Sequence, residues 1–261
     1  MHPTLLTIGS FELASYGVMT ALGYGIASYY LVRRLPKNLD KDTFWNLIFI
    51  LFMGALVGAK LLFIALTWPQ LNGSTWEKIS YFVQNFRYGF VFYGGLIVAV
   101  AAVITYMKKK KLPLLATSDF IITALPLGHA FGRVGCFLAG CCHGKPTTMP
   151  WGVTFTDPHA MVAPDLLGVP VHPVQLYEAV GNLLIFFILH KLYNHPHKNG
   201  TVLLAYIFCY GTLRFALEFF RGDFRGAYLF GLSPAQIITL LLALSAGVIW
   251  WRITKKGQSH G

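Results

Sequence analysis

Continuous apolar segments of about 20 residues constrain the fold of this chain more than any other feature. We count seven of them, at roughly 11–33, 44–67, 90–107, 115–138, 174–193, 201–220 and 232–251. An apolar run of this length crosses the ~30 Å hydrocarbon core of a bilayer as a helix, which satisfies its own backbone hydrogen bonds in lipid. The runs are not alternating, which argues against a β-barrel. We expect an all-α, polytopic membrane protein of seven transmembrane helices, forming one integral membrane domain over residues 1–261.

Composition supports a membrane location. The chain is 55% hydrophobic and 12% charged, whereas a soluble domain carries about 25% charged residues. The net charge of +11 does not indicate nucleic-acid binding, because the basic residues cluster just past apolar segments, where topology signals lie. The start of the chain has neither a basic stretch nor a small-residue cleavage site, so we expect the first apolar segment to stay in the membrane.

The loops predict the orientation. The basic stretches "RRLPKNLDKD", "KKKK", "HKLYNHPHK" and "RITKK" follow the first, third, fifth and seventh segments. The intervening loops 68–89, 139–173 and 221–231 hold fewer basic residues by comparison. Positive loops face the cytoplasm, so the N-terminus is expected outside and the C-terminus inside. Residues 139–173, rich in Pro, Gly, Thr and His, are expected to form a small extracytoplasmic head segment.

The sixth apolar segment carries three charged residues on one helix face. Arg214, Glu218 and Arg221 follow at i, i+4 and i+7. Charged residues inside a membrane span are costly and mark functional sites by default. One interpretation is a structural Arg214–Glu218 ion pair with Arg221 reaching the interface. The other is an anion site, because arginine forks suit phosphate.

Two further spans bring polar residues to the same level. Arg133 lies near the outer end of the fourth segment between Gly132 and Gly135, and it is either an interfacial anchor or part of a pocket. The fifth segment opens with "HPVQLYEAVGN", which places Gln175 and Glu178 near its outer start. A carboxylate there serves either the helix dipole or a functional site.

Two tyrosines and a glycine pair complete this set. Tyr93 precedes Gly94 and Gly95 in the third segment, and Tyr16 lies near the outer end of the first. The glycines indicate either tight helix packing or backbone exposed to a ligand. With the predicted orientation, the polar residues of five spans share the outer end of the membrane. We therefore expect a polar cavity open to the outer leaflet, with arginines at the depth of a phospholipid headgroup.

The ordered motifs resemble those of the bacterial prolipoprotein diacylglyceryl transferases. They are "MHPTLLTIGSFELASYG", "YGGL", "GRVGCFLAG", "HPVQLYEA", "YGTLRFALEFFR" and "LSPAQI", and the resemblance covers nearly the whole chain. It implies a multi-pass enzyme of the bacterial inner membrane. Such an enzyme moves diacylglyceryl from phosphatidylglycerol to the lipobox cysteine of a prolipoprotein, forms a thioether and releases glycerol phosphate. The resemblance implies neither a metal nor an organic cofactor.

The resemblance also assigns roles by position. Arg133 falls on the essential arginine of the family signature, and Arg214 on the arginine thought to hold the lipid headgroup. Glu218 and Arg221 keep the family spacing, and Tyr16 falls on the first-span tyrosine. The glycine pair in "YGGL" also falls on family glycines. Phosphatidylglycerol and a prolipoprotein, or another acceptor, are the implied partners.

Several positions depart from that pattern. The family has histidine where this chain has Tyr93. The signature asparagines, glycine and glutamate correspond here to Cys136, Ala139, Gly140 and Cys141. The arginines are retained, while the histidine proposed as a base and the signature glutamate are not. Candidates for the base are therefore Tyr93, whose phenol has a reference pKa of about 10, His143 and Glu218.

The cysteines Cys136, Cys141 and Cys142 allow several interpretations. They are small packing residues, a Cys136–Cys141 disulfide, or a reactive thiolate beside arginine. Adjacent Cys141 and Cys142 do not have the usual zinc spacing, so the sequence predicts no metal site. The predicted function is a phospholipid-dependent diacylglyceryl transferase. The alternatives are a divergent relative that transfers a lipid-derived group to another acceptor through Cys141 or Cys142, and a non-catalytic phospholipid-binding protein.

Overall fold

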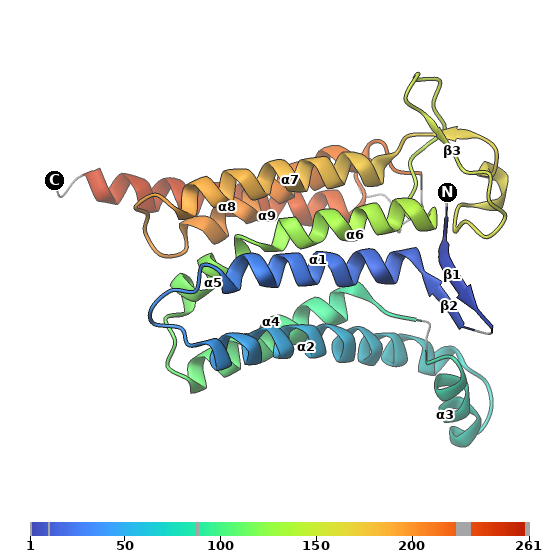
Figure 1. Cartoon of the computed structure of the whole chain (residues 1–261), viewed down its shortest axis with the longest axis horizontal. Helices are drawn as coiled ribbons and strands as arrows, with labels where there is room; N and C mark the ends of the chain where they lie inside the picture. The colour runs from blue at the N-terminus through green and yellow to red at the C-terminus, as the bar shows by residue number, and fades with distance from the viewer. Residues whose placement is uncertain (1, 10, 87–88, 223–230, 259–261) are drawn as a thin grey trace. The chain divides into compact units, whose positions relative to one another are not determined.

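The protein is mostly helical. The computed structural model describes residues 2–9, 11–86, 89–222 and 231–258 (Figure 1). The helices are α1 (Ser15–Val32), α2 (Lys41–Thr67), α3 (Thr75–Gln84), α4 (Phe92–Lys109), α5 (Leu114–Ile122), α6 (Leu125–Ala139), α7 (Val174–Tyr193), α8 (Thr201–Glu218) and α9 (Pro234–Gln258). Two short hairpins pair β1 (Thr4–Ile8) with β2 (Phe11–Ala14), and β3 (Val153–Thr154) with β4 (Pro170–Val171). Single 3₁₀ turns occupy Trp68–Gln70 and Pro164–Leu166.

The helices confirm the predicted polytopic helical fold. Among the described residues, six segments are long and apolar enough to cross a membrane: 41–70, 92–109, 114–139, 174–193, 201–218 and 234–252. The first expected span corresponds to α1, which has 18 residues but is not among the six. The fourth is built from α5 and α6, which are separated just before Pro126, the second residue of α6. Pro126 has no N–H to donate to the carbonyl of Ile122, the last residue of α5, so a continuous helix would lack this hydrogen bond.

The chain divides into two compact units, residues 1–33 with 115–261 and residues 34–114. In the first unit, α1 packs on α6, α6 on α7, α7 on α8 and α8 on α9. Small residues allow the close α1–α6 approach: a Cβ on Gly23 would lie 2.7 Å from the Gly128 carbonyl oxygen. Near the other end of this contact, Gly135 faces the backbone of Tyr16. These contacts fix the α6 segment that carries Arg133.

The second unit is built on the contact between α2 and α4. A Cβ on Gly94 would lie 2.4 Å from the Gly58 carbonyl oxygen, and a Cβ on Gly95 would lie 2.7 Å from that of Ala55. Both glycines are buried. Of the two interpretations of this pair, tight helix packing is therefore the one that matches the contacts around it.

Lys60 of α2 is a buried cation that the sequence analysis did not identify. Its ammonium donates to the carbonyl oxygens of Asn85 (3.3 Å) and Phe86 (3.2 Å). It also lies between 5.2 and 5.3 Å from the ring centres of Phe63, Phe86 and Phe90. Backbone carbonyls and aromatic faces thus replace its hydration inside the unit.

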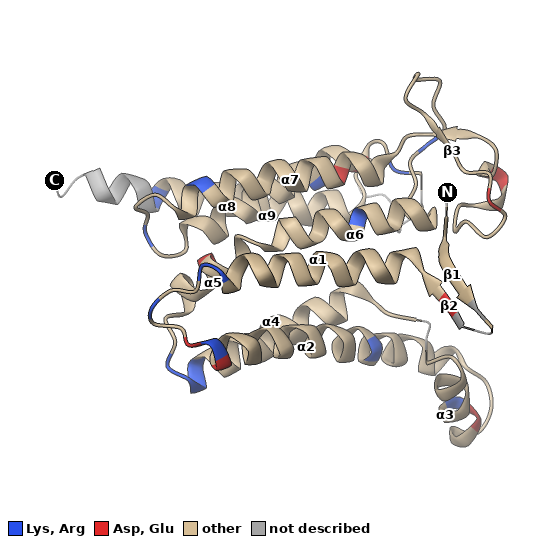
Figure 2. Ribbon diagram, viewed as in Figure 1, with Lys and Arg blue, Asp and Glu red and all other residues tan. Residues whose placement is uncertain are grey.

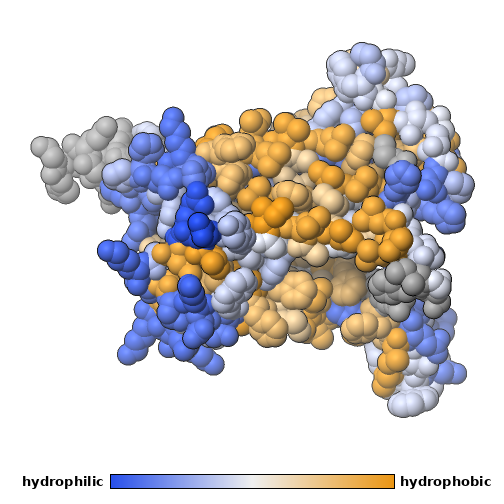
Figure 3. Space-filling view, in the orientation of Figure 1, coloured by the Kyte–Doolittle hydropathy of each residue, from blue (hydrophilic) through white to orange (hydrophobic). Residues whose placement is uncertain are grey.

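Charged and polar residues concentrate at the helix ends. Figure 2 shows most Lys, Arg, Asp and Glu there, with a few charges within α2 and within the helices that form the site described below. Figure 3 shows apolar side chains along the sides of the helices and polar ones toward their ends. Exposed apolar side chains along a helix are the surface expected next to lipid.

The segment 139–173, expected as a head, has its own small core. Phe155, Val162 and Val171 are buried together, and Phe137 of α6 packs against them. The strands β3 and β4 pair Val153 with Val171. This core attaches the segment to the end of α6 and therefore positions the loop that follows the helix.

Candidate active site

A buried ion-pair network joins α6, α7 and α8. Glu178, at the start of α7, is fully buried, and its Oε1 lies 3.0 Å from Nη2 of Arg133 on α6. The hydroxyl of Tyr210 on α8 donates to the same oxygen (3.2 Å). One turn before Arg133, His129 Nε2 accepts from Arg133 Nε (3.2 Å). The Arg133 guanidinium is thereby held by two partners on two helices.

A second carboxylate holds the other two arginines. Glu218 pairs with Arg214 one turn earlier on α8 and lies 3.9 Å from Nε of Arg221. Arg221 also reaches Oε2 of Glu178, with Nη1 at 4.0 Å. Its side chain is only 2% exposed and is therefore enclosed by the protein. Arg221 bridges the two carboxylates.

The N-terminus of α9 also contacts this network. The hydroxyl of Ser233 donates to Oε1 of Glu218 (2.8 Å) and accepts from the Gln236 amide (3.2 Å). The Gln236 side chain accepts in turn from the Ser233 amide (2.9 Å). This is a reciprocal capping box, so the residue that caps the N-terminus of α9 also orients Glu218.

The charges of the network do not cancel. Among the described residues, three guanidiniums, of Arg133, Arg214 and Arg221, face two carboxylates, of Glu178 and Glu218, which leaves one positive charge in this part of the chain. Oε2 of Glu178 is buried and has no hydrogen-bond partner among the described residues. Uncompensated buried charge is costly, and an anion would offset this excess. A phosphate group matches both the charge and the fork geometry of arginine.

The loop after α6 is fixed against the residues around Arg221. The helix ends at Gly140, which has the left-handed φ of 79° typical of a helix C-terminus. The amide of Gly144 then donates to the His172 carbonyl (3.1 Å), and that of Gly222 donates to His143 (3.1 Å). The side-chain amide of Gln175 donates to the Cys141 carbonyl (2.7 Å). These bonds hold the cysteine-containing loop beside the arginine network.

Three thiols meet in this loop. The Sγ atoms of Cys136, Cys141 and Cys142 all lie within 4.8 Å of one another, and none forms a disulfide. Hydrogen bonds from Cys136 and Cys141, followed by the charge of Arg221, lower the pKa of the Cys142 thiol. Of the interpretations from sequence, the structure does not contain the Cys136–Cys141 disulfide.

The other predicted site residues lie as follows. Tyr16 is half-exposed at the start of α1, with its backbone against Gly135. His143 is buried and its Nδ1 lies 3.1 Å from the Gly144 carbonyl oxygen. Tyr93, half-exposed at the start of α4, belongs to the second unit with the glycine pair. The structure thus brings together the charged residues of α6, α7 and α8 with the cysteines and Gln175.

Sequence reasoning missed two members of the network. Tyr210 lies one turn before Arg214, on the same helix face, and that spacing was the available signal. Ser233 was marked by a capping pattern, serine followed three residues later by Gln236. Their contacts with the carboxylates depend on which helices are neighbours.

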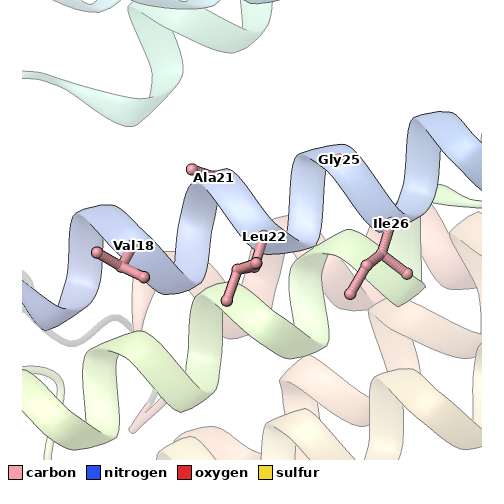
Figure 4. Close-up of a pocket in the computed structure, with 5 residues that line it drawn as sticks. All are labelled: Val18, Ala21, Leu22, Gly25 and Ile26. Atoms are coloured by element: carbon pink, nitrogen blue, oxygen red, sulfur yellow. The ribbon is translucent and has the colours of Figure 1, made fainter.

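An open apolar groove lies on α1. It is lined by Val18, Ala21, Leu22, Gly25 and Ile26. Figure 4 shows the side chains of Val18, Leu22 and Ile26 along one side of the helix, at i, i+4 and i+8. The small residues Ala21 and Gly25 leave the surface hollow beside them. Only carbon-rich groups line it, so the groove suits an alkyl chain rather than a polar ligand.

Comparison with known proteins identifies the family. A family model described as "Prolipoprotein diacylglyceryl transferase" matches residues 3–252. The phosphatidylglycerol–prolipoprotein diacylglyceryl transferase of Clostridium tetani is 34% identical over 241 residues, which cover 92% of this chain and 93% of that protein. A protein of the same name from Finegoldia magna is 31% identical over 252 residues, 95% and 94% of the two chains. The phosphatidylglycerol–prolipoprotein diacylglyceryl transferase 2 of Clostridium perfringens is 30% identical over 262 residues, which cover 100% of this chain and 98% of that protein. The chain belongs to the prolipoprotein diacylglyceryl transferase family.

Proposed function

We propose that this protein transfers the diacylglyceryl group of phosphatidylglycerol to the cysteine thiol of a prolipoprotein. Family membership and relatives named for this activity support the proposal. The observation in the structure that carries it is the buried network in which, among the described residues, three arginines face two glutamates. The comparisons do not favour the alternatives of a different acceptor or a non-catalytic lipid-binding protein.

The reaction needs stabilisation of a leaving phosphate. The acceptor sulfur attacks the glycerol carbon that bears the phosphodiester, the carbon–oxygen bond breaks, and the electron pair leaves with the phosphate as glycerol phosphate. Arg133, Arg214 and Arg221 are positioned to share the charge that develops on the phosphate oxygens. Glu178 and Glu218 orient these guanidiniums in advance, so little reorganisation accompanies the reaction.

The site belongs at the outer face of the bacterial inner membrane. The basic stretches follow the opposite ends of the spans, and by the positive-inside rule these stretches are cytoplasmic. The N-terminus is then outside, the C-terminus inside, and residues 139–173 form an extracytoplasmic head. The apolar groove of α1 begins two residues after Tyr16, which falls on the first-span tyrosine of the family. This position supports binding of a lipid acyl chain in the groove. Orientation is tested by labelling single cysteines introduced at His159 and at Lys109 from outside intact cells, in a variant that lacks the native cysteines.

Complementation tests the proposed activity in cells. A strain depleted of its own transferase is supplied with this chain or with Arg133→Ala, Arg214→Ala or Lys191→Ala. Lys191 is an exposed residue near the C-terminal end of α7 and serves as the control. We expect growth with the wild type and with Lys191→Ala, and none with either arginine variant at equal protein levels. Lack of rescue by the wild type, or full rescue by both arginine variants, contradicts the proposal.

A further inference from the structure

The three thiols at the end of α6 have the spacing of a metal site. Zinc–sulfur bonds are about 2.3 Å long, so three sulfurs around one Zn²⁺ lie about 3.8–4.0 Å apart. The Sγ atoms of Cys136, Cys141 and Cys142 already lie within 4.8 Å of one another. Side-chain rotations that move the sulfur atoms by about 1 Å or less would place one ion at bonding distance from all three.

The backbone at Cys142 explains how adjacent cysteines share this site. Cys142 has φ of 60°, one of two non-glycine residues with positive φ among those described. This left-handed conformation is uncommon and energetically unfavourable for a residue with a Cβ. With this backbone, the thiols of the neighbouring residues Cys141 and Cys142 lie within 4.8 Å of each other. With this backbone, neighbouring cysteines can therefore both reach one metal ion.

The surroundings hold this conformation and supply compensating charge. Gln175 bonds the Cys141 carbonyl, and the loop is fixed on its other side through Gly222. Three thiolates and one Zn²⁺ sum to one negative charge. Arg221 forms a hydrogen bond with Cys142, and Arg133 interacts electrostatically with Cys136 and Cys142.

We propose that Cys136, Cys141 and Cys142 bind Zn²⁺ and leave its fourth position for the thiol of the acceptor cysteine. Catalytic zinc sites keep such a position, and a thiol that coordinates zinc is deprotonated. Cu⁺ fits this role less well. Three thiolates would complete its coordination and leave no position for the acceptor thiol. The proposal departs from the metal-free reaction that the resemblance implied. It rests on the proposed function, because the acceptor thiol is the ligand that completes the zinc.

The metal would provide the deprotonation of the acceptor thiol that the two carboxylates do not provide. Glu178 and Glu218 are both paired with arginines, so neither is placed as a free base. The zinc-bound sulfur attacks the glycerol carbon; one carbon–sulfur bond forms and one carbon–oxygen bond breaks. The electron pair leaves with the phosphate, and the proton lost by the thiol ends on the released glycerol phosphate. No oxidant or reductant is consumed.

Metal binding is tested on the full-length protein in detergent, with a non-thiol reductant present. The protein is loaded with Co²⁺, whose absorption reports thiolate ligation and tetrahedral geometry, or with Zn²⁺, which is counted by mass spectrometry of the metal. We expect one equivalent per chain, at least a tenfold loss of affinity in Cys142→Ser and Cys136→Ser, and no change in Cys209→Ser. No stoichiometric binding, or equal binding by all variants, overturns the metal site.

The fourth position is tested separately from turnover. A lipobox peptide is added to the Co²⁺-loaded protein without lipid, and the same peptide with serine in place of cysteine is the control. A spectral change with cysteine alone supports thiol coordination, and its absence overturns that part of the proposal. Transfer at full rate by metal-free protein overturns the zinc proposal and leaves the transferase function intact. Thiolate-bound metal without any thioether product contradicts the transferase function instead.

Discussion

Replacing Glu178 with glutamine removes the carboxylate that faces two arginines while keeping nearly the same shape. Its oxygens lie 3.0 Å from Arg133 and 4.0 Å from Arg221. At an effective dielectric constant of about 20, a pair at 4 Å contributes about 4 kcal/mol of attraction and a closer pair somewhat more. Desolvation offsets part of this, and breaking a buried pair costs about 3–5 kcal/mol in measured cases.

We therefore expect Glu178→Gln to lower the free energy of unfolding by about 3–5 kcal/mol. Transfer activity should fall by at least about 100-fold, because Arg133 loses the partner that orients it toward the leaving phosphate. Unfolding is followed in detergent by a thermal scan, and activity by thioether formation on a lipobox peptide. Activity is measured at a temperature where the variant remains folded.

Glu12→Gln, at an exposed position of β2, makes the same chemical change away from the network and is the control. It should leave both stability and activity unchanged. Wild-type stability and wild-type rate in Glu178→Gln would refute the reasoning, because the buried pair would then neither hold the fold nor orient Arg133.

Three further substitutions probe other contacts, each measured by thermal unfolding and by the thioether assay. Ser233→Ala removes the hydroxyl that caps α9 and bonds Glu218, and it should cost about 1 kcal/mol and lower the rate severalfold; an unchanged rate would separate the cap from the site. Asp119→Ala leaves two backbone amides at the start of α8 unpaired and should cost about 1–3 kcal/mol with little effect on chemistry, whereas unaltered stability would contradict the contact. Gly94→Ala places a Cβ 2.4 Å from a carbonyl oxygen of α2 and should destabilise by about 1–3 kcal/mol. Gly25→Ala, with nothing within 4 Å, is its control, and equal stability of the two variants would contradict the packing argument.

The helices could be predicted from sequence because each apolar run is continuous and ends at polar residues. All expected spans overlap helices, and α7 coincides with its expected range of 174–193. The β1–β2 hairpin, the β3–β4 pair and α3 were not predicted. The β1–β2 hairpin is too short for its alternation to be distinct from the apolar run that follows it. The amphipathic α3, Thr75–Gln84, lies in the loop interpreted as an interfacial belt, where its capping box Ser74–Glu77 was the missed signal.

The site could be predicted in its parts but not in its pairing. A charged side chain inside the membrane is costly in free energy, and this identifies Arg133, Glu178 and Arg214 as candidates from sequence alone. The pairing of Arg133 with Glu178 links two helices, and no spacing rule along one helix gives it. The thiol cluster includes Cys142 with a φ of 60°, a conformation that the residue type does not indicate. Sequence therefore locates the charged groups, while helix packing and loop geometry decide which of them meet.

The central claim is that this chain forms a thioether between a lipobox cysteine and diacylglyceryl by means of its buried arginine network. The most direct measurement incubates purified protein with phosphatidylglycerol vesicles and a lipobox peptide, and follows the peptide mass and released glycerol phosphate together. We expect a diacylglyceryl-modified peptide, an equal amount of glycerol phosphate, and loss of both products in Arg214→Ala. If folded wild-type protein binds the lipid but leaves the peptide unmodified, the account is contradicted. Equal product from Arg214→Ala would also contradict it.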